Sequence, residues 1–202
     1  VVTIPLGMAD RAGAQPRRPV PSPRRPYFLF VGALRYYKGL PTLLKAASMV
    51  DADIVIAGKE PPGSTLREQA RQAGLENVTF AGMVSDDEKD RLLEGCQAFV
   101  LPSDQRSEAF GMVLCEAAMF SRPMITCEIG TGTTFVNVHG ETGLVVPPGN
   151  PGALAEAMNT LLHDRDAAAV YGRQARERYE ALFSGAALGK AHADLYRRLV
   201  TG

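Results

Sequence analysis

The chain lacks both an excess of charge and a set of spaced cysteines. Its 202 residues carry 22 Lys or Arg and 22 Asp or Glu, so the formal net charge is zero. A balanced charge excludes bulk attraction to nucleic acid as the main function. Cys96, Cys115 and Cys127 have no metal-ligand spacing, and their odd number among apolar neighbours predicts reduced, buried thiols. This cysteine usage favours a cytoplasmic location.

Long apolar runs and a targeting segment are also missing. No run approaches the roughly 18 apolar residues that a membrane-spanning helix needs, and no signal peptide opens the chain. The first residue is Val1, which suggests a fragment of a longer protein. Because 46% of the residues are hydrophobic, the chain has enough apolar volume for a substantial core.

What the sequence does contain is a regular alternation of short apolar runs and helical patterns. We expect strands at residues 27–31, 53–57, 77–81, 98–101, 123–126 and 143–146. We expect helices near residues 39–49, 64–74, 86–95, 111–120 and 151–163. This alternation predicts right-handed crossovers and a parallel sheet covered on both faces. The expected fold class is therefore α/β, a Rossmann-like three-layer α/β/α fold.

The composition divides the chain into three segments. Residues 1–26 are expected to be an interdomain linker, because their proline- and arginine-rich run cannot form a packed element. Within this linker, residues 1–7 have the pattern of one strand and a turn. Residues 27–183 form the Rossmann-like domain. Residues 184–202 form a C-terminal helix after a break near Phe183.

The loop after the first expected strand carries two cations. Arg35 and Lys38 follow Gly32, and a helical pattern begins directly after them. A guanidinium fork, an ammonium group and the free amides of a helix start together suit a diphosphate. The alternative is that both cations are solvated loop residues. The glycine-lysine-serine order of a Walker loop is missing.

The run Gly130–Thr134 is a second glycine-rich loop. It lacks the third glycine of a dinucleotide-binding fingerprint. A loop of small residues that approaches a ligand closely, followed by a helix near Phe135, explains it better.

The most informative stretch places Glu108 and Glu116 on either side of Gly111. An apolar strand ends just before this stretch and a helical pattern follows it, and open α/β sheets bind ligands at such crossings. On the loop, Glu108 could accept hydrogen bonds from sugar hydroxyls. The first amides of the helix, at Met112 and Val113, could point at a phosphate.

Glu116 falls on a helix face that is otherwise apolar, since Leu114, Ala117 and Ala118 surround it. A carboxylate in such a place needs partners. Two remain open: a ribose diol, which offers two donors, or a purely structural salt bridge.

Several motifs in a fixed order carry a resemblance to a known family. They are Phe30-Val31-Gly32 with Lys38-Gly39, Asn77-Val78-Thr79-Phe80-Ala81-Gly82, Pro102-Ser103, Glu108-Ala109-Phe110-Gly111 with Glu116-Ala117, and Gly140-Glu141-Thr142-Gly143-Leu144-Val145-Val146-Pro147. With these motifs the chain resembles the C-terminal, donor-binding domain of the retaining GT-B glycosyltransferases of family 4, the group 1 glycosyltransferases. The resemblance covers nearly the whole chain, from Val1 to about Phe183. It implies the C-terminal half of a GT-B fold.

The resemblance also implies roles for individual residues. Glu108 would contact the hydroxyls of the transferred sugar, and Glu116 would bind the ribose. Arg35 and Lys38 would neutralise the leaving nucleoside diphosphate, although many relatives have an arginine where this chain has Ala33. The implied catalytic residues are Glu108, Lys38 and Arg35. The implied donor-binding residues are Gly32, Arg35, Lys38, Met83, Val84, Glu108, Phe110, Gly111, Met112, Val113, Glu116 and Thr131.

Within this set, the backbone at Met83 and Val84 would frame the nucleobase, and Thr131 would lie near the phosphates. Negative charge grows on the phosphate as the nucleoside diphosphate leaves, so cations and helix amides stabilise it. The resemblance therefore implies chemistry without a metal or other cofactor.

The resemblance implies transfer of a hexose from a nucleoside diphosphate sugar to a lipid-linked or polysaccharide acceptor in bacterial cell-surface glycan synthesis. The run Leu34–Gly39 favours mannose. An N-terminal acceptor domain, absent here, would complete the active site, so the chain alone should bind nucleotide without transferring sugar. The family implies a cytoplasmic location at the inner membrane face, where linker arginines at 17, 18, 24 and 25 could assist peripheral contact. A GT-B-fold sugar-nucleotide epimerase, a phosphorylase-like protein and a non-catalytic nucleotide-binding module are the alternatives.

Overall fold

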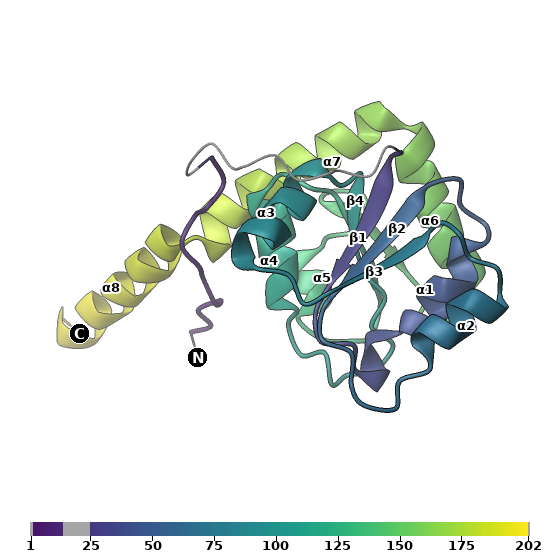
Figure 1. The fold of residues 1–202 in the computed structure, drawn as a ribbon. Helices are drawn as coiled ribbons and strands as arrows, with labels where there is room; N and C mark the ends of the chain where they lie inside the picture. The colour runs from purple at the N-terminus through teal and green to yellow at the C-terminus, as the bar shows by residue number, and fades with distance from the viewer. Residues whose placement is uncertain (1, 14–24, 202) are drawn as a thin grey trace.

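The computed structural model describes residues 2–13 and 25–201 of the chain, and these form one six-stranded parallel sheet (Figure 1). The strand order is β3-β2-β1-β4-β5-β6, and every pairing is parallel. The strands are β1 Tyr27–Val31, β2 Asp53–Ala57, β3 Val78–Gly82, β4 Ala98–Leu101, β5 Met124–Cys127 and β6 Gly143–Val146.

Continuous apolar runs explain the central strands. Every residue of β1, β4 and β5 is buried, as expected of parallel strands that are covered on both faces. The expected bounds are confirmed for β1, β2, β4 and β6, whereas β3 and β5 each begin one residue later than expected. At β3 the reason is Asn77, whose side-chain amide donates to the carbonyls of Ala47 and Ala52 and fastens the loop before the strand.

Helices cover both faces of the sheet, which confirms the three-layer prediction (Figure 1). One layer holds α1, α2 and α6, and the other holds α3, α4, α5 and α7. The helices are α1 Leu40–Ala47, α2 Leu66–Gln72, α3 Asp86–Gly95, α4 Met112–Met119, α5 Thr133–Val136, α6 Pro151–His163 and α7 Arg165–Arg178.

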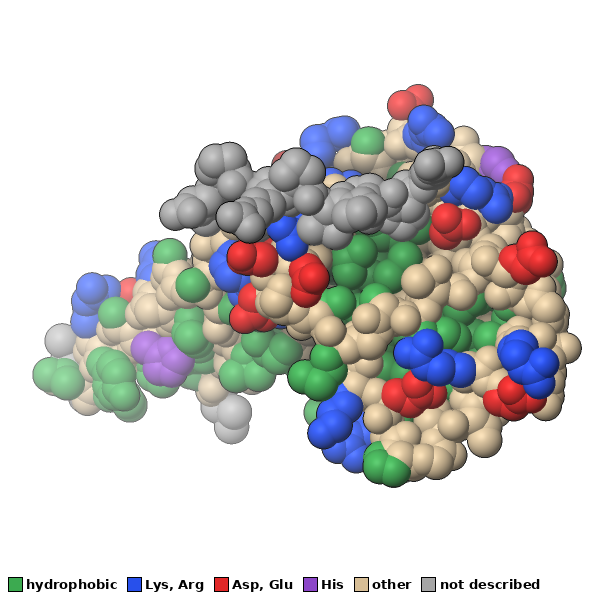
Figure 2. Space-filling view, in the orientation of Figure 1, with side chains coloured by type: hydrophobic (Ala, Val, Ile, Leu, Met, Phe, Trp, Pro, Cys, Tyr) green, Lys and Arg blue, Asp and Glu red, His purple; other side chains and the backbone are tan. Residues whose placement is uncertain are grey.

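The end of the chain is helical and leaves the body of the domain. α7 runs into a π-helical turn, η2 Tyr179–Phe183, and the expected break follows at Ser184 before α8 Gly185–Thr201. α8 projects beyond the body of the domain (Figure 1), and Figure 2 shows hydrophobic side chains gathered along it. Its last turns expose Tyr196, Leu199 and Val200. Within residues 2–13 and 25–201, no helix combines the length and apolar character that crossing a membrane requires.

The strand expected at residues 1–7 does not form over the described residues 2–7. No strand of the described residues lies beside the chain there, and it instead lies against the end of η2. The Met8 amide donates to the Phe183 carbonyl at 2.9 Å, and the Gly185 amide donates to the Met8 carbonyl at 2.8 Å. Asp10 forms an ion pair with Arg176 of α7 at 2.5 Å. The proline- and arginine-rich run at 14–24 lies outside the described residues.

The three cysteines are free and buried, as the sequence predicts. Burial raises the pKa of Cys96, Cys115 and Cys127 to about 12 in each case. We expect a disulfide reagent at pH 8 to modify none of them in the folded chain and all three in urea, because the thiolate is the reactive form. Measuring the absorbance of released thionitrobenzoate checks this, and rapid labelling of a folded chain would contradict the assigned burial.

Candidate functional site

Two loops meet at the carboxyl edge of the sheet, where the strand order reverses. β1 lies between β2 and β4, so the loops after β1 and β4 leave the sheet side by side. Crevices at such switch points bind ligands in open α/β sheets. The residues predicted from the sequence fall mainly on these two loops.

Lys38 and Glu108 meet across this switch point as a buried ion pair. The Lys38 ammonium donates to Oε2 of Glu108, although the residues are 70 positions apart. Both residues are more than nine-tenths buried, at 9% and 8% exposure. The buried Ser103 hydroxyl donates to the same carboxylate oxygen at 3.2 Å. The sequence predicts a ligand contact for each charge separately, and it does not predict that they pair.

Glycines allow this pairing by letting the two loops approach closely. Gly39 has a φ of 65°, and a Cβ there would lie 1.9 Å from the Pro102 carbonyl oxygen. Only glycine accommodates both conditions. Gly32 has a φ of 152°, and a Cβ on it would lie 3.8 Å from the Lys38 ammonium nitrogen. The structure thus brings Gly32 and Lys38 together, as the resemblance implies.

Arg35 is placed differently from Lys38. It precedes the short 3₁₀ helix η1 Tyr36–Lys38, and its side chain is exposed. In the described part of the chain it makes no side-chain hydrogen bond or ion pair. The side chain is therefore able to reach an anion at the carboxyl edge, and its assignment stays a prediction.

The start of α4 presents backbone amides at the same edge. Gly111 precedes α4 with a φ of 75°, and no side chain caps the first turn. The first amides of a helix have no intrahelical acceptor, and they favour an anion. Met112 is exposed and Val113 is half-buried at this turn. The local chemistry matches the predicted phosphate or sugar contact.

The loop after β5 is tied to the loop after β4. The Gly132 amide donates to the Ala109 carbonyl at 2.8 Å, and a Cβ on Gly132 would lie 2.7 Å from the Phe110 ring. Phe110 packs edge-on against Phe183, with 6.1 Å between the ring centroids. Thr131 is half-buried beside these residues, and its carbonyl accepts a weak hydrogen bond from the Thr134 hydroxyl at 3.4 Å. The structure therefore brings Phe110 and the predicted Thr131 loop together.

Glu116 sits between two cations. Its Oε1 accepts a hydrogen bond from Arg11 at 2.9 Å and another from Lys89 at 2.7 Å. The Glu116 side chain is 13% exposed. The structural salt bridge that the sequence leaves open is thus present. Both of these cations contact Oε1, and among the described residues no hydrogen bond to Oε2 is formed.

Arg11, Lys89 and Asp90 were not identified from the sequence. Arg11 also donates to both oxygens of Asp90, at 3.2 and 3.3 Å, and this pairing raises the arginine's pKa. Burial alone would lower the pKa of Lys89, but the hydrogen bonds and charges of Glu116 and Asp86 together outweigh it and raise the pKa. No local pattern marks these contacts, since Arg11 and Glu116 are 105 positions apart.

Met83 and Val84 follow β3, the strand at the edge of the sheet. Gly82 turns the chain with a φ of 72°, after which Met83 is 76% exposed and Val84 is half-buried against the core. Their backbone lies at the carboxyl edge together with the other loops. Their assignment as a frame for the base stays a prediction.

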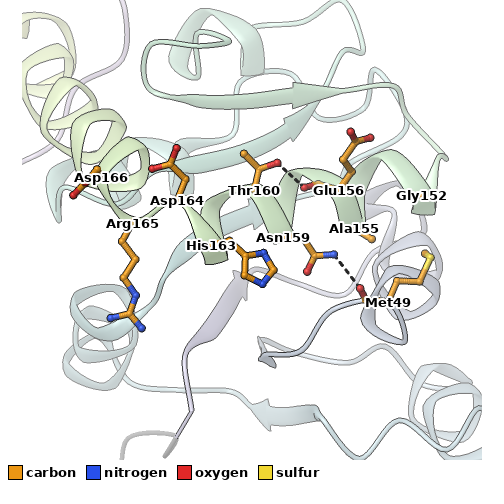
Figure 3. A pocket seen from close by; sticks show the side chains of 10 residues that line it. All are labelled: Met49, Gly152, Ala155, Glu156, Asn159, Thr160, His163, Asp164, Arg165 and Asp166. Atoms are coloured by element: carbon orange, nitrogen blue, oxygen red, sulfur yellow. Dashed lines mark hydrogen bonds between the residues drawn. The ribbon is translucent and has the colours of Figure 1, made fainter.

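A separate open pocket lies at the opposite, amino edge of the sheet (Figure 3). It is lined by one side of α6 from Gly152 to His163, by the start of α7 and by Met49, which precedes β2. The Asn159 amide donates to the Met49 carbonyl at 3.0 Å across it. None of the predicted donor-binding residues lines this pocket.

Two Asp-any-Asp triplets occur, at residues 51–53 and 164–166, and both fall toward this amino edge. Asp51 and Asp53 form ion pairs with Arg25, which belongs to the arginine set considered for membrane contact. The arginines at 17, 18 and 24 lie outside the described residues. Over residues 2–13 and 25–201, no group of three His, Cys, Asp or Glu side chains is arranged to hold a metal ion.

Comparison with known proteins places this arrangement among glycosyltransferases. The sequence pattern of the family described as "Glycosyl transferases group 1" matches residues 14–178. The chain is 46% identical over 174 residues to the O-antigen chain mannosyltransferase C of Escherichia coli, covering 86% of this chain and 47% of that protein. It is 51% identical over 158 residues to the D-rhamnosyltransferase WbpZ of Pseudomonas aeruginosa, covering 78% and 42% respectively. The chain thus spans about half the length of these relatives.

Solved structures share the fold. The sucrose-phosphate synthase of Thermosynechococcus elongatus matches with a TM-score of 0.79 at 30% identity, over 88% of this chain and 46% of that one. The Anabaena protein HepE in complex with UDP matches with a TM-score of 0.76 at 22% identity, over 87% and 49%. The expected fold, one Rossmann-like half of a GT-B structure, is confirmed.

Proposed function

Because the chain belongs to the family of group 1 glycosyl transferases, we propose that it is the part of such an enzyme that binds a nucleoside diphosphate sugar. The single observation that carries this proposal is the buried Lys38–Glu108 pair at the switch point. Two charges so well buried cost free energy that a purely structural site could avoid with apolar residues. Their retention suits a site that must offer both a cation and an acceptor.

In the proposed site each predicted residue has a chemical task. Lys38, Arg35 and the amides at Met112 and Val113 stabilise the charge that grows on the leaving diphosphate. Glu108 accepts hydrogen bonds from the hydroxyls of the transferred sugar. Because fixed cations and amides already supply positive charge, the proposal needs no metal ion.

Glu116 binds the ribose in this proposal. The contacts from Arg11 and Lys89 hold Oε1, while Oε2 accepts from a ribose hydroxyl. The structural salt bridge and the ribose role, which the sequence presents as alternatives, are thus compatible. A fixed acceptor binds with a smaller loss of side-chain entropy.

The donor sugar and acceptor follow from the relatives. The two named bacterial relatives transfer mannose and rhamnose, respectively, and the first acts on an O-antigen chain. We propose a hexose donor, with mannose favoured, and a cell-surface polysaccharide or its lipid-linked precursor as acceptor. A location at the cytoplasmic face of the inner membrane belongs to the same proposal.

The acceptor half of the active site lies in a separate, N-terminal domain in this proposal. The chain spans less than half of the two named relatives. α8 supports the idea, because Tyr196, Leu199 and Val200 expose apolar surface at the end of a projecting helix. Such surface needs a covering partner, and a second domain of the same enzyme supplies one.

Calorimetric titration with guanosine, uridine and adenosine diphosphates, with and without a chelator of divalent cations, tests nucleotide binding. Glu116→Gln is expected to lower the affinity for the diphosphate that binds most tightly by about tenfold to a hundredfold, because hydrogen bonds to charged groups contribute ~1.5–3 kcal/mol. Glu68→Gln, on the exposed carboxylate that pairs with Arg71 in α2, is the matched control and should leave the affinity unchanged. Unchanged affinity in the Glu116 variant would contradict the ribose role.

A further inference from the structure

Arg11 lies outside the Rossmann-like domain expected at residues 27–183, yet it contacts the carboxylate assigned to the ribose. We infer that Arg11 is a positioning residue for nucleotide recognition, which acts on the ribose through Glu116. The inference rests on the proposed function and goes beyond it, because it makes a residue of the N-terminal segment part of the donor site.

The contacts of Arg11 form a clamp between two helices. Its guanidinium donates through Nε and Nη2 to both oxygens of Asp90 in α3, at 3.3 and 3.2 Å. Its Nη2 also donates to Oε1 of Glu116 in α4, at 2.9 Å. A planar fork bound at two points on Asp90 has a fixed direction. The position of Oε1 is therefore set by the arginine.

Burial gives this clamp its strength. The side chain of Asp90 is only 4% exposed and that of Glu116 is 13% exposed, whereas the arginine is 34% exposed. Two carboxylates this close repel each other where water cannot screen them, and the guanidinium between them removes that repulsion. Lys89 contacts Glu116 as well, but an ammonium on a flexible stem does not impose a direction.

The position of the Arg11 side chain depends on how the N-terminal segment around residues 10 and 11 is held. The Arg11 amide donates to the Met119 sulfur at 3.2 Å, and the neighbouring Asp10 pairs with Arg176. The segment is thus anchored on α4 and α7 independently of Glu116. An anchored segment positions Arg11, and Arg11 then orients Glu116 with Oε2 free for the ribose.

The test compares affinity for a ribonucleoside diphosphate with affinity for its 2′-deoxy counterpart. The probes are guanosine diphosphate and 2′-deoxyguanosine diphosphate, or the uridine pair if that binds tighter. The unmodified chain should prefer the ribose form by about tenfold or more, since the 2′-hydroxyl donates to a charged acceptor. Arg11→Met should reduce this preference at least about threefold, because a misdirected carboxylate loses part of that hydrogen bond. A residue with only a structural role would weaken both probes equally and leave the ratio unchanged.

Control variants separate this inference from the ribose assignment. Asp10→Asn removes only the ion pair with Arg176, whereas the Arg11 amide keeps its contact with the Met119 sulfur and the guanidinium keeps its two contacts with Asp90, so the preference for ribose should persist. If Arg11→Met does not fold, the double variant Arg11→Gln with Asp90→Asn removes both charges of this ion pair, and its preference should fall likewise. An unchanged preference in the Arg11 variants, together with a lost preference in Glu116→Gln, overturns the inference. A preserved preference in Glu116→Gln overturns the ribose role itself.

Discussion

Lys38→Met is expected to destabilise the folded chain by about 3–5 kcal/mol, because it leaves the buried Glu108 charge without its partner. The same change should abolish measurable binding of the nucleoside diphosphate, because it removes the ammonium group assigned to the charge of the diphosphate. Urea unfolding followed by circular dichroism measures the free energy of unfolding, and calorimetry measures the affinity.

A double variant distinguishes the two losses. Lys38→Met with Glu108→Gln removes both charges, while the amide can still accept from the Ser103 hydroxyl. It should recover at least about half of the lost stability, because an uncharged pair of similar size needs no compensation. Nucleotide binding should stay lost. Recovery of both properties would contradict a role for the pair in donor binding.

An exposed ion pair supplies the matched control. Arg71 pairs with Glu68 on the surface of α2, at 2.7 Å, with the arginine side chain 75% exposed. Arg71→Met should leave the free energy of unfolding nearly unchanged, because surface ion pairs contribute little. A loss as large as that of Lys38→Met would mean that burial does not explain the first result.

Gly39→Ala is expected to cost more than about 4 kcal/mol of stability, which is at the extreme of single substitutions. The φ of 65° is unfavourable for alanine, and the added Cβ would lie 1.9 Å from the Pro102 carbonyl oxygen. A backbone atom cannot move aside without separating the two loops. Binding should weaken as well, because this contact brings Lys38 against Glu108. Thermal and urea unfolding measure the effect.

Gly74→Ala separates the steric clash from the backbone conformation. Gly74 has the same φ of 65°, but a Cβ there meets nothing within 4 Å. Its replacement should cost only about 1–2 kcal/mol, the penalty of a left-handed conformation for alanine. Equal losses at the two glycines would show that the close approach to Pro102 is not the cause.

Most of the fold could be predicted from the sequence because its helices and strands depend on patterns of neighbouring residues. The buried runs of β1 and β4 and the capped start of α6 at Asn150 are signals within a few residues of one another. The prediction of a strand within residues 1–7 was wrong because strand formation also depends on residues far away in the sequence. Its pattern of a strand and a turn is local, but a strand also needs a neighbour, and Met8 instead pairs with the end of a π-helical turn.

The candidate site was only partly predictable. Glu108, Glu116 and Lys38 were identified because they flank strand-to-helix crossings, and the resemblance assigned their tasks. Their partners were not, because Ser103, Lys89 and Arg11 reach them from other loops and helices. The sequence described residues 1–26 as a linker, and nothing in its composition distinguishes Arg11 from the arginines that follow.

By itself, the sequence determined the kinds of element, their order and the edge of the sheet at which the glutamates fall. Periodicity, glycine and proline act over short distances along the chain, so these features do not depend on packing. Only the tertiary structure decided which charges meet. Lys38 pairs with Glu108 at the point where the strand order reverses, and Arg11 of the N-terminal segment pairs with Glu116 of α4. Such pairings follow from how the layers pack and which way side chains point, and no local pattern encodes them.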